Sequence, residues 1–260
     1  EDLLSLHEHF RTLITEKTRG FLPDSRRWLF DRVEAWLADP DGACVRVLLG
    51  DPGVGKSAAV MHLLQSVNLA THKRVAAFHV CDAVRNPGLT VLDFSLFVRS
   101  LVWQLARAVP AYKGALLALR GKQSVEDVLD EIGDKMRAGI DDAKDKRAAA
   151  AAKSDFETFV VAPLTRDGVA DEVARWAAED PGARPLPLLL VVDSFDESLD
   201  ATDRARSHVD LDKTIAGVLS DQDLHRRLRE RAPWLRLLAT SRRDLGLGNK
   251  SRLSQWLPGG

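Results

Sequence analysis

The segment Gly50 to Ser57 constrains the fold of this chain more than any other, because its sequence Gly-Asp-Pro-Gly-Val-Gly-Lys-Ser fits the pattern G-x-x-x-x-G-K-[ST]. The run Cys44–Leu49 before it is short and rich in β-branched residues, which predicts a strand. After it, Ala58–Val67 has the pattern of a helix. Glycines let the loop between them wrap closely, with backbone N–H groups pointing inward. The sequence therefore predicts a strand, a glycine-rich loop and a helix in direct succession.

Further strand and helix patterns alternate along the rest of the chain. The run 188–192 is continuously apolar, as expected for a strand that is buried on both faces of a parallel sheet. Other strand candidates are 74–80 and 234–239, and a last strand could lie near 251–256. Helical spacing marks 91–109, 156–164 and about 210–230. This alternation predicts an α/β fold with a mostly parallel sheet.

The chain divides into two parts by pattern. Residues 1–40 form an N-terminal helical segment, with amphipathic helices expected over 2–16 and from about residue 25. Residues 41–260 form the main domain, split by a charged, Ala-rich insertion at about 121–153, where Asp141–Arg147 leads into five alanines. The absence of an initiator Met and the Pro-Gly-Gly end suggest a piece of a longer protein, and we expect flanking domains beyond it.

Composition excludes several classes of protein. With 37 basic and 38 acidic side chains, the net charge of −1 provides no global attraction to nucleic acid or to anionic membranes. No apolar run approaches the roughly 18 residues that a membrane helix needs. Two cysteines cannot form a disulfide framework, so we expect a reduced, cytoplasmic environment, with Cys44 and Cys81 as buried strand residues. No histidine has the spacing of a metal ligand, and His7 and His9 are expected to be solvated.

The chemistry of the loop indicates phosphate binding. Its inward N–H groups and the N-terminus of the following helix favour an anion. The Lys56 ammonium can reach the β- and γ-phosphates of a nucleotide, and the Ser57 hydroxyl can hold Mg²⁺. A strand before the motif and a helix after it are the context that this interpretation requires.

Polar side chains follow two more of the predicted strands. Asp193 ends the run 188–192, at the edge where α/β sheets bind ligands, and can bind Mg²⁺ directly or through water. Asp196 and Glu197 come just after it, and either could orient or deprotonate an attacking water; we favour Glu197. The strand 234–239 leads into Thr240-Ser241-Arg242, whose hydroxyl or cation could sense a γ-phosphate if this strand lies between the other two.

Together these three motifs resemble the NACHT family within the STAND class of P-loop NTPases. The resemblance implies a three-layer α/β sandwich in which the sensor strand separates the Walker B strand from the P-loop strand. It implies that ATP or ADP and Mg²⁺ are the cofactors, that Ser57 and Asp193 bind the metal and that Arg242 is the sensor. The upstream Phe21–Arg26 departs from the family's Gly-containing motif at Asp24 and Ser25. The implied nucleotide-binding residues are Gly50, Asp51, Pro52, Gly53, Val54, Gly55, Lys56, Ser57 and Ala58.

The leading functional hypothesis is therefore a regulatory NTPase that hydrolyses ATP slowly through Lys56, Asp196, Glu197 and Arg242. It would act as a switch for signalling or oligomerisation, and would meet its own copies or partner proteins through flanking domains. One alternative is a nucleotide-dependent assembly scaffold without significant hydrolysis. Others are a small-molecule phosphotransferase and an AAA+ type DNA-linked ATPase, the latter disfavoured by the near-zero net charge.

Overall fold

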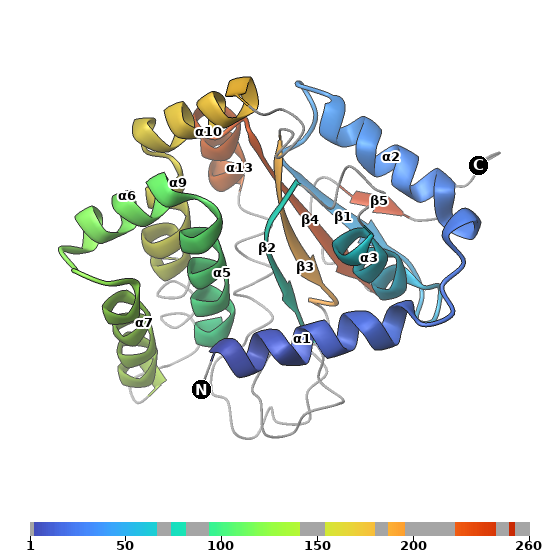
Figure 1. The fold of residues 1–260 in the computed structure, drawn as a ribbon, viewed down its shortest axis with the longest axis horizontal. Helices are drawn as coiled ribbons and strands as arrows, with labels where there is room; N and C mark the ends of the chain where they lie inside the picture. The colour runs from blue at the N-terminus through green and yellow to red at the C-terminus, as the bar shows by residue number, and fades with distance from the viewer. Residues whose placement is uncertain are drawn as a thin grey trace.

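Five strands form one sheet in the computed structural model, which describes residues 3–66, 74–81, 94–140, 154–179, 187–195, 222–242 and 250–252 (Figure 1). The strand order is β2-β3-β4-β1-β5, and every neighbouring pair runs parallel. The strands are β1 (Val45–Leu49), β2 (Val75–Val80), β3 (Leu188–Asp193), β4 (Leu235–Ser241) and β5 (Lys250–Arg252). The prediction of a parallel α/β sheet is thus confirmed for the described residues.

Strands β3 and β4 are buried along their whole length. All six residues of β3 and all seven of β4 are buried, because each strand has neighbours at both edges and helices pack over the sheet. β4 lies between β1 and β3, the order expected for these three strands, and Leu49 is in register with Ser241. The carboxyl ends of β1, β3 and β4 therefore meet at one edge.

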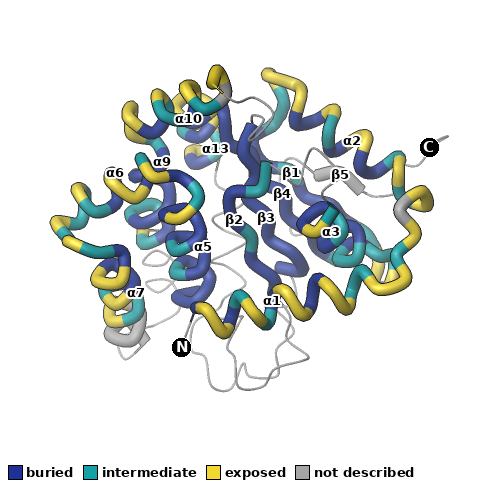
Figure 2. Tube along the Cα trace, viewed as in Figure 1, coloured by how far each residue is buried: buried dark blue, intermediate teal, exposed yellow. Residues whose placement is uncertain are grey.

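Helices flank the sheet on both sides, which makes the described residues an α/β sandwich (Figure 1). In the view of Figure 1, α2 and α3 lie to the right of the central strands, and α5, α6, α7, α9, α10 and α13 lie to the left. Their inward faces are buried and their outward faces exposed (Figure 2). The helices are α1 (Leu3–Thr18), η1 (Pro23–Arg26), α2 (Arg27–Ala38), α3 (Lys56–Gln65), α5 (Phe94–Ala108), α6 (Pro110–Arg120), α7 (Val125–Ile140), η2 (Glu157–Val161), α9 (Ala162–Leu164), α10 (Asp167–Glu179) and α13 (Gln222–Arg231).

Helix α1 packs against α3 and α5 through the apolar face that its sequence predicted. The expectation that His7 on this helix is solvated was wrong. Its ring centroid lies 4.5 Å from that of Trp103 and 5.7 Å from that of Phe78. Arg107 also packs over the Trp103 ring, so His7 closes an aromatic cluster between α1, β2 and α5. The tertiary structure supplied these partners, and the polar helix face gave no sign of them.

Part of the expected insertion at 121–153 is packed helix. In α7, Val128 and Ile132 are fully buried, and the helix packs against α5. The charged, Ala-rich stretch 141–153 lies outside the described residues, and the division of the chain at residue 40 stays a prediction. The cysteine prediction is confirmed, because Cys44 and Cys81 are both buried.

The helical segment predicted over 156–164 contains a wide turn. Residues Glu157–Val161 form a π-helical turn that runs into α9. The buried Tyr112 hydroxyl donates a 2.7 Å hydrogen bond to the Phe159 carbonyl within this turn. Of the helix expected over 210–230, only the part from Gln222 is described.

Candidate functional site

The sheet topology brings three sequence motifs to one edge. The loop after β1, the residues after β3 and the end of β4 all lie at the carboxyl ends of adjacent parallel strands. The Gly50 N–H donates to the Ser241 carbonyl at 3.3 Å, and the Phe195 N–H donates to the Thr240 carbonyl at 3.2 Å. Such an edge is where open α/β sheets bind ligands. The candidate water-activating residues Asp196 and Glu197 lie outside the described residues.

The loop adopts a conformation that depends on its glycines. Gly53 and Gly55 have φ angles of 80° and 87°, in the left-handed region that other residues rarely adopt. Gly55 is the N-cap of α3, so the helix begins at Lys56 and directs its first N–H groups at the loop. The tip of the loop, Asp51 to Gly53, is exposed. This arrangement leaves backbone donors available to an anion approaching from solvent.

The Lys56 side chain is folded back onto the loop. It is only 7% exposed, and its Nζ donates to the carbonyl oxygens of Gly50 at 2.6 Å and Asp51 at 3.1 Å. A buried ammonium needs such oxygen partners to offset the loss of hydration. The Lys56 charge is thus held within the loop, where an anion would meet it.

A chain of hydroxyl groups connects the loop to the two neighbouring strand ends. The Ser57 Oγ lies 3.0 Å from the Ser194 Oγ, within hydrogen-bond distance. The Ser194 hydroxyl donates to Asp193 Oδ2 at 3.3 Å, and the Thr240 hydroxyl donates to Asp193 Oδ1 at 2.6 Å. Both carboxylate oxygens of the fully buried Asp193 are therefore hydrogen-bonded.

Burial raises the pKa of Asp193 above its usual value, while hydrogen bonds from Thr240, Ser57 and Ser194 act in the opposite direction. A buried carboxylate beside a serine hydroxyl offers oxygen ligands, the kind that Mg²⁺ prefers. The residues present therefore fit a magnesium ion held from Ser57 and Asp193. No cluster of three or more His, Cys, Asp or Glu side chains suited to another metal occurs among the residues that the structure describes.

Arg26 comes from the segment before α2 and reaches the loop. A Cβ atom added to Gly55 would lie 3.0 Å from one of its guanidinium nitrogens. The departure of Phe21–Arg26 from the family motif thus does not keep this arginine away from the loop. Arg242 directly follows Ser241, the residue paired with Leu49 at the entry to the loop, and its side chain is half-buried.

Sequence reasoning did not foresee how two residues of this site act. Ser194 had no assigned role, and Thr240 was considered only within Thr240-Ser241-Arg242, as a hydroxyl that could sense a γ-phosphate, and not as a partner of Asp193. Ser194 has a φ of 56°, and no sequence pattern predicts this left-handed conformation for a serine. The signal that could have found Thr240 is its place at the end of a strand that lies between the other two motif strands.

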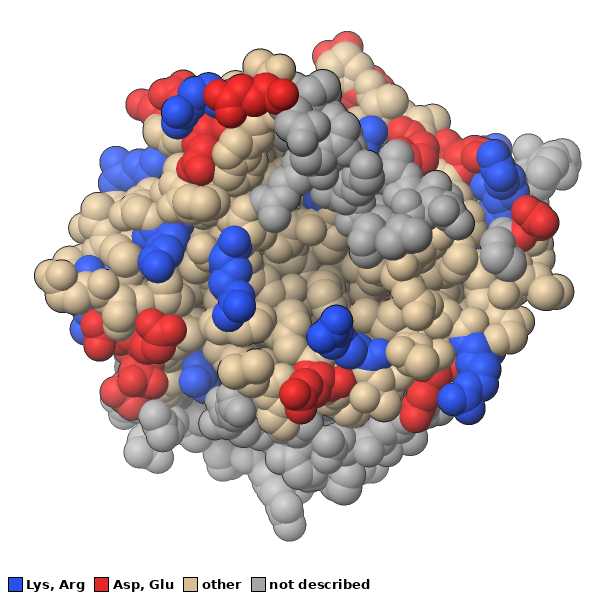
Figure 3. Space-filling model, viewed as in Figure 1, with Lys and Arg blue, Asp and Glu red and all other residues tan. Residues whose placement is uncertain are grey.

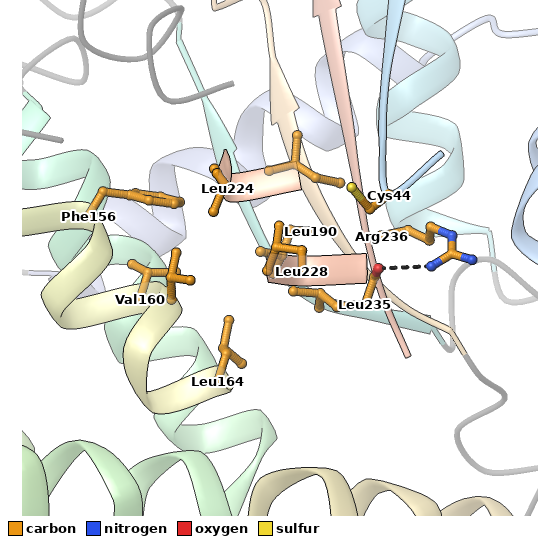
Figure 4. Close-up of a pocket in the computed structure, with 11 residues that line it drawn as sticks. Cys44, Phe156, Val160, Leu164, Leu190, Leu224, Leu228, Leu235 and Arg236 are labelled. Carbon is orange, nitrogen blue, oxygen red and sulfur yellow. Dashed lines mark hydrogen bonds between the residues drawn. The ribbon is translucent and has the colours of Figure 1, made fainter. Parts of the chain in front are cut away.

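A separate apolar cavity lies away from this edge (Figure 4). Phe156, Val160 and Leu164 point toward side chains of β3, β4 and α13, while Arg236 points away and donates to the Leu235 carbonyl (Figure 4). A volume of about 10 Å³ admits at most one water molecule. The cavity is therefore a packing gap and not a ligand site.

Basic and acidic side chains are scattered among one another on the face drawn in Figure 3. This pattern agrees with the near-zero net charge and offers no extended basic surface on that face. Among the described helices, none is long and apolar enough to cross a bilayer.

The fold and the strand-edge site define an α/β protein with an all-parallel sheet. A comparison with protein-family models matches residues 24–148 to the family described as Nephrocystin 3, N-terminal. The match covers slightly less than half of the chain and contains the loop, but ends before Asp193 and Thr240. Searches of curated proteins and of solved structures gave no match.

Proposed function

We propose that this chain is a magnesium-dependent ATP-binding domain that hydrolyses ATP slowly and acts as a nucleotide-dependent switch. The observation that carries the proposal is the contact between Ser57 and Ser194 beside the buried Asp193. It joins a glycine-rich anion loop to an acidic strand end, which are the two parts that phosphoryl transfer requires.

Each residue would have a separate task. The loop N–H groups and the start of α3 would bind the phosphates, and Lys56 would exchange its loop carbonyls for phosphate oxygens. Ser57 and Asp193 would hold Mg²⁺, which when bound supplies positive charge to the β- and γ-phosphates. Glu197 or Asp196 would orient the attacking water, and Arg242 would stabilise the γ-phosphate.

The same contact suggests how nucleotide would act as a switch. The Ser57 hydroxyl lies against Ser194, and Ser194 precedes Asp196 and Glu197 in the sequence, so a ligand bound at Ser57 would act next to the segment that carries these two acids. Bound ATP and ADP would therefore favour different arrangements of this segment. Self-association or partner binding through flanking domains would follow from that difference.

Binding of fluorescent N-methylanthraniloyl-ATP tests the proposal. Lys56→Ala should weaken binding at least about tenfold, because it removes charge-assisted hydrogen bonds worth about 1.5–3 kcal/mol. Lys113→Ala is the matched control, since Lys113 is an exposed lysine on α6. Circular dichroism would establish that both variants are folded. Equal binding by the wild type and Lys56→Ala, or no binding by the wild type, would show that the loop does not hold nucleotide.

Hydrolysis is tested separately by phosphate release. Glu197→Gln should abolish turnover and leave nucleotide affinity nearly unchanged, because the amide keeps the size of the carboxylate and loses its basicity. Turnover that is absent from the wild type, with nucleotide still bound, would favour the assembly scaffold over the switch.

A further inference from the structure

The Thr240 hydroxyl occupies a central place among the hydrogen bonds at the strand edge. It donates to Asp193 Oδ1 at 2.6 Å and accepts the Ser194 N–H at 2.8 Å, and Thr240 is fully buried. The Thr240 carbonyl accepts the Phe195 N–H at 3.2 Å. One residue of β4 thus bonds three successive residues at the end of β3.

These bonds leave the hydroxyl little freedom. Because a threonine hydroxyl has one proton, and the Ser194 N–H requires a lone pair, the proton is directed at Asp193. Asp193 Oδ1 is thereby held toward β4. Its other oxygen, Oδ2, faces the Ser194 hydroxyl, and through it Ser57 on the loop.

The backbone that follows Asp193 also depends on Thr240. Ser194 has a φ of 56°, a conformation that is costly for a residue with a side chain. The hydrogen bonds from the Ser194 and Phe195 N–H groups to Thr240 hold the chain in this turn. Thr240 therefore holds the two residues that directly follow Asp193.

We propose that Thr240 is a positioning residue for the magnesium site. It fixes the Asp193 carboxylate so that one oxygen faces the loop, and it fixes the turn that follows. This inference rests on the proposed function. It is distinct from the sensor role of Arg242 on the same strand, since Thr240 acts through Asp193 and contacts no phosphate in the proposal. Thr240 should therefore affect the Mg²⁺ requirement and not the affinity for metal-free nucleotide.

The test compares Thr240→Val with Thr240→Ser in the whole chain. Valine keeps the shape of threonine without the hydroxyl, whereas serine keeps the hydroxyl. The measurement is binding of N-methylanthraniloyl-ATP, first with EDTA and then across a Mg²⁺ titration. We expect Thr240→Val to raise the half-saturating Mg²⁺ concentration about tenfold, the change for one charge-assisted hydrogen bond. Binding in EDTA should change less than about twofold, and Thr240→Ser should resemble the wild type.

The outcomes separate this inference from the proposed function. If the wild type and Lys56→Ala bind nucleotide equally, the proposed function fails and the role of Thr240 fails with it. If binding depends on Lys56 but Thr240→Val has a wild-type Mg²⁺ titration, only the positioning role is overturned. Equal weakening with and without Mg²⁺ would also overturn it, because that is the mark of a purely structural residue.

If Thr240→Val does not fold, the same Mg²⁺ titration is made with Thr240→Cys. A thiol is a weaker donor than a hydroxyl, so the half-saturating Mg²⁺ concentration should rise by a smaller factor in the same direction. No rise in that variant would overturn the inference.

Discussion

The edge strand β2 depends on one glutamine, and replacing Gln104 by leucine tests this directly. The Gln104 side chain donates to the Phe78 carbonyl at 2.7 Å and accepts the Phe78 N–H at 3.0 Å. It thus replaces the neighbouring strand that β2 lacks on that side, since β2 stands at the end of the strand order. Gln104 is 7% exposed, and its amide also bonds to Ser100.

Leucine has nearly the volume of glutamine but cannot bond to the backbone. Each backbone group left buried without a partner costs about 1–3 kcal/mol, and Phe78 would lose two partners. The substitution also removes the cost of burying the glutamine amide, which returns about 1 kcal/mol to the free energy of unfolding. The free energy of unfolding should therefore fall by about 3 kcal/mol, a large share of the roughly 5–15 kcal/mol typical of a domain.

Urea denaturation followed by tryptophan fluorescence measures this loss, because Trp103 lies one position before Gln104. With a slope of about 2 kcal/mol per molar urea, the midpoint should fall by about 1.5 M. Gln65→Leu is the matched control, since Gln65 is exposed and makes only a solvent-exposed hydrogen bond with the Thr18 hydroxyl, so its replacement should change stability by about 0.5 kcal/mol or less. A urea midpoint for Gln104→Leu within about 0.5 M of the wild-type midpoint would refute the reasoning. It would mean that water forms hydrogen bonds with the Phe78 N–H and carbonyl in place of Gln104.

Three further predictions concern other parts of the molecule. Burial lowers the pKa of His7 below its usual 6.5, so the unfolded chain takes up a proton at a higher pH than the folded protein does. Thermal stability should therefore fall as the pH drops below about 6.5, and His7→Asn should lessen that fall. Tyr112→Phe leaves the Phe159 carbonyl without its buried donor, and urea denaturation should show a loss of about 1–2 kcal/mol. Gly55→Ala places a Cβ at a φ of 87° and against Arg26, so N-methylanthraniloyl-ATP binding should weaken and stability should fall by more than about 1–2 kcal/mol.

Each of these predictions has a result that would contradict it. An equal loss of stability between pH 7.5 and 5.5 in the wild type and His7→Asn would remove His7 as the cause. A change below about 0.5 kcal/mol in Tyr112→Phe would mean that the Phe159 carbonyl finds another donor. Gly53→Ala is the control for Gly55→Ala, because Gly53 has a similar φ of 80° and nothing within 4 Å of an added Cβ. Equal effects at both positions would show that contact with Arg26 is unimportant.

Several elements were predictable because they depend on short-range pattern. The boundaries of β1 and β3 agree with the apolar runs to within a residue, and α1 buries the face that its spacing marked. The surroundings of His7 and the packing of α7 were not predictable in this way. Both depend on α5, which is distant in sequence from α1 and which buries residues of α7.

The candidate site was likewise predictable only in part from the sequence. The loop residues and Asp193 could be chosen from sequence, because glycine, lysine and carboxylate chemistry at fixed spacing indicates phosphate and metal binding. The turn at Ser194 and the bond from Thr240 to Asp193 could not be found in that way, because a left-handed serine and a hydroxyl bond across 47 positions are products of strand order.

The sequence by itself determined the α/β class, the strand–loop–helix unit and the residue types available for phosphate chemistry, because these follow from local periodicity and from side-chain chemistry. The tertiary structure decided which groups meet. Placing β4 between β1 and β3 puts Thr240 against Asp193 and Ser194 against Ser57, and it brings Gly50 to the Ser241 carbonyl. The physical reason is that parallel strands joined by long connections align their carboxyl ends whatever their distance along the chain.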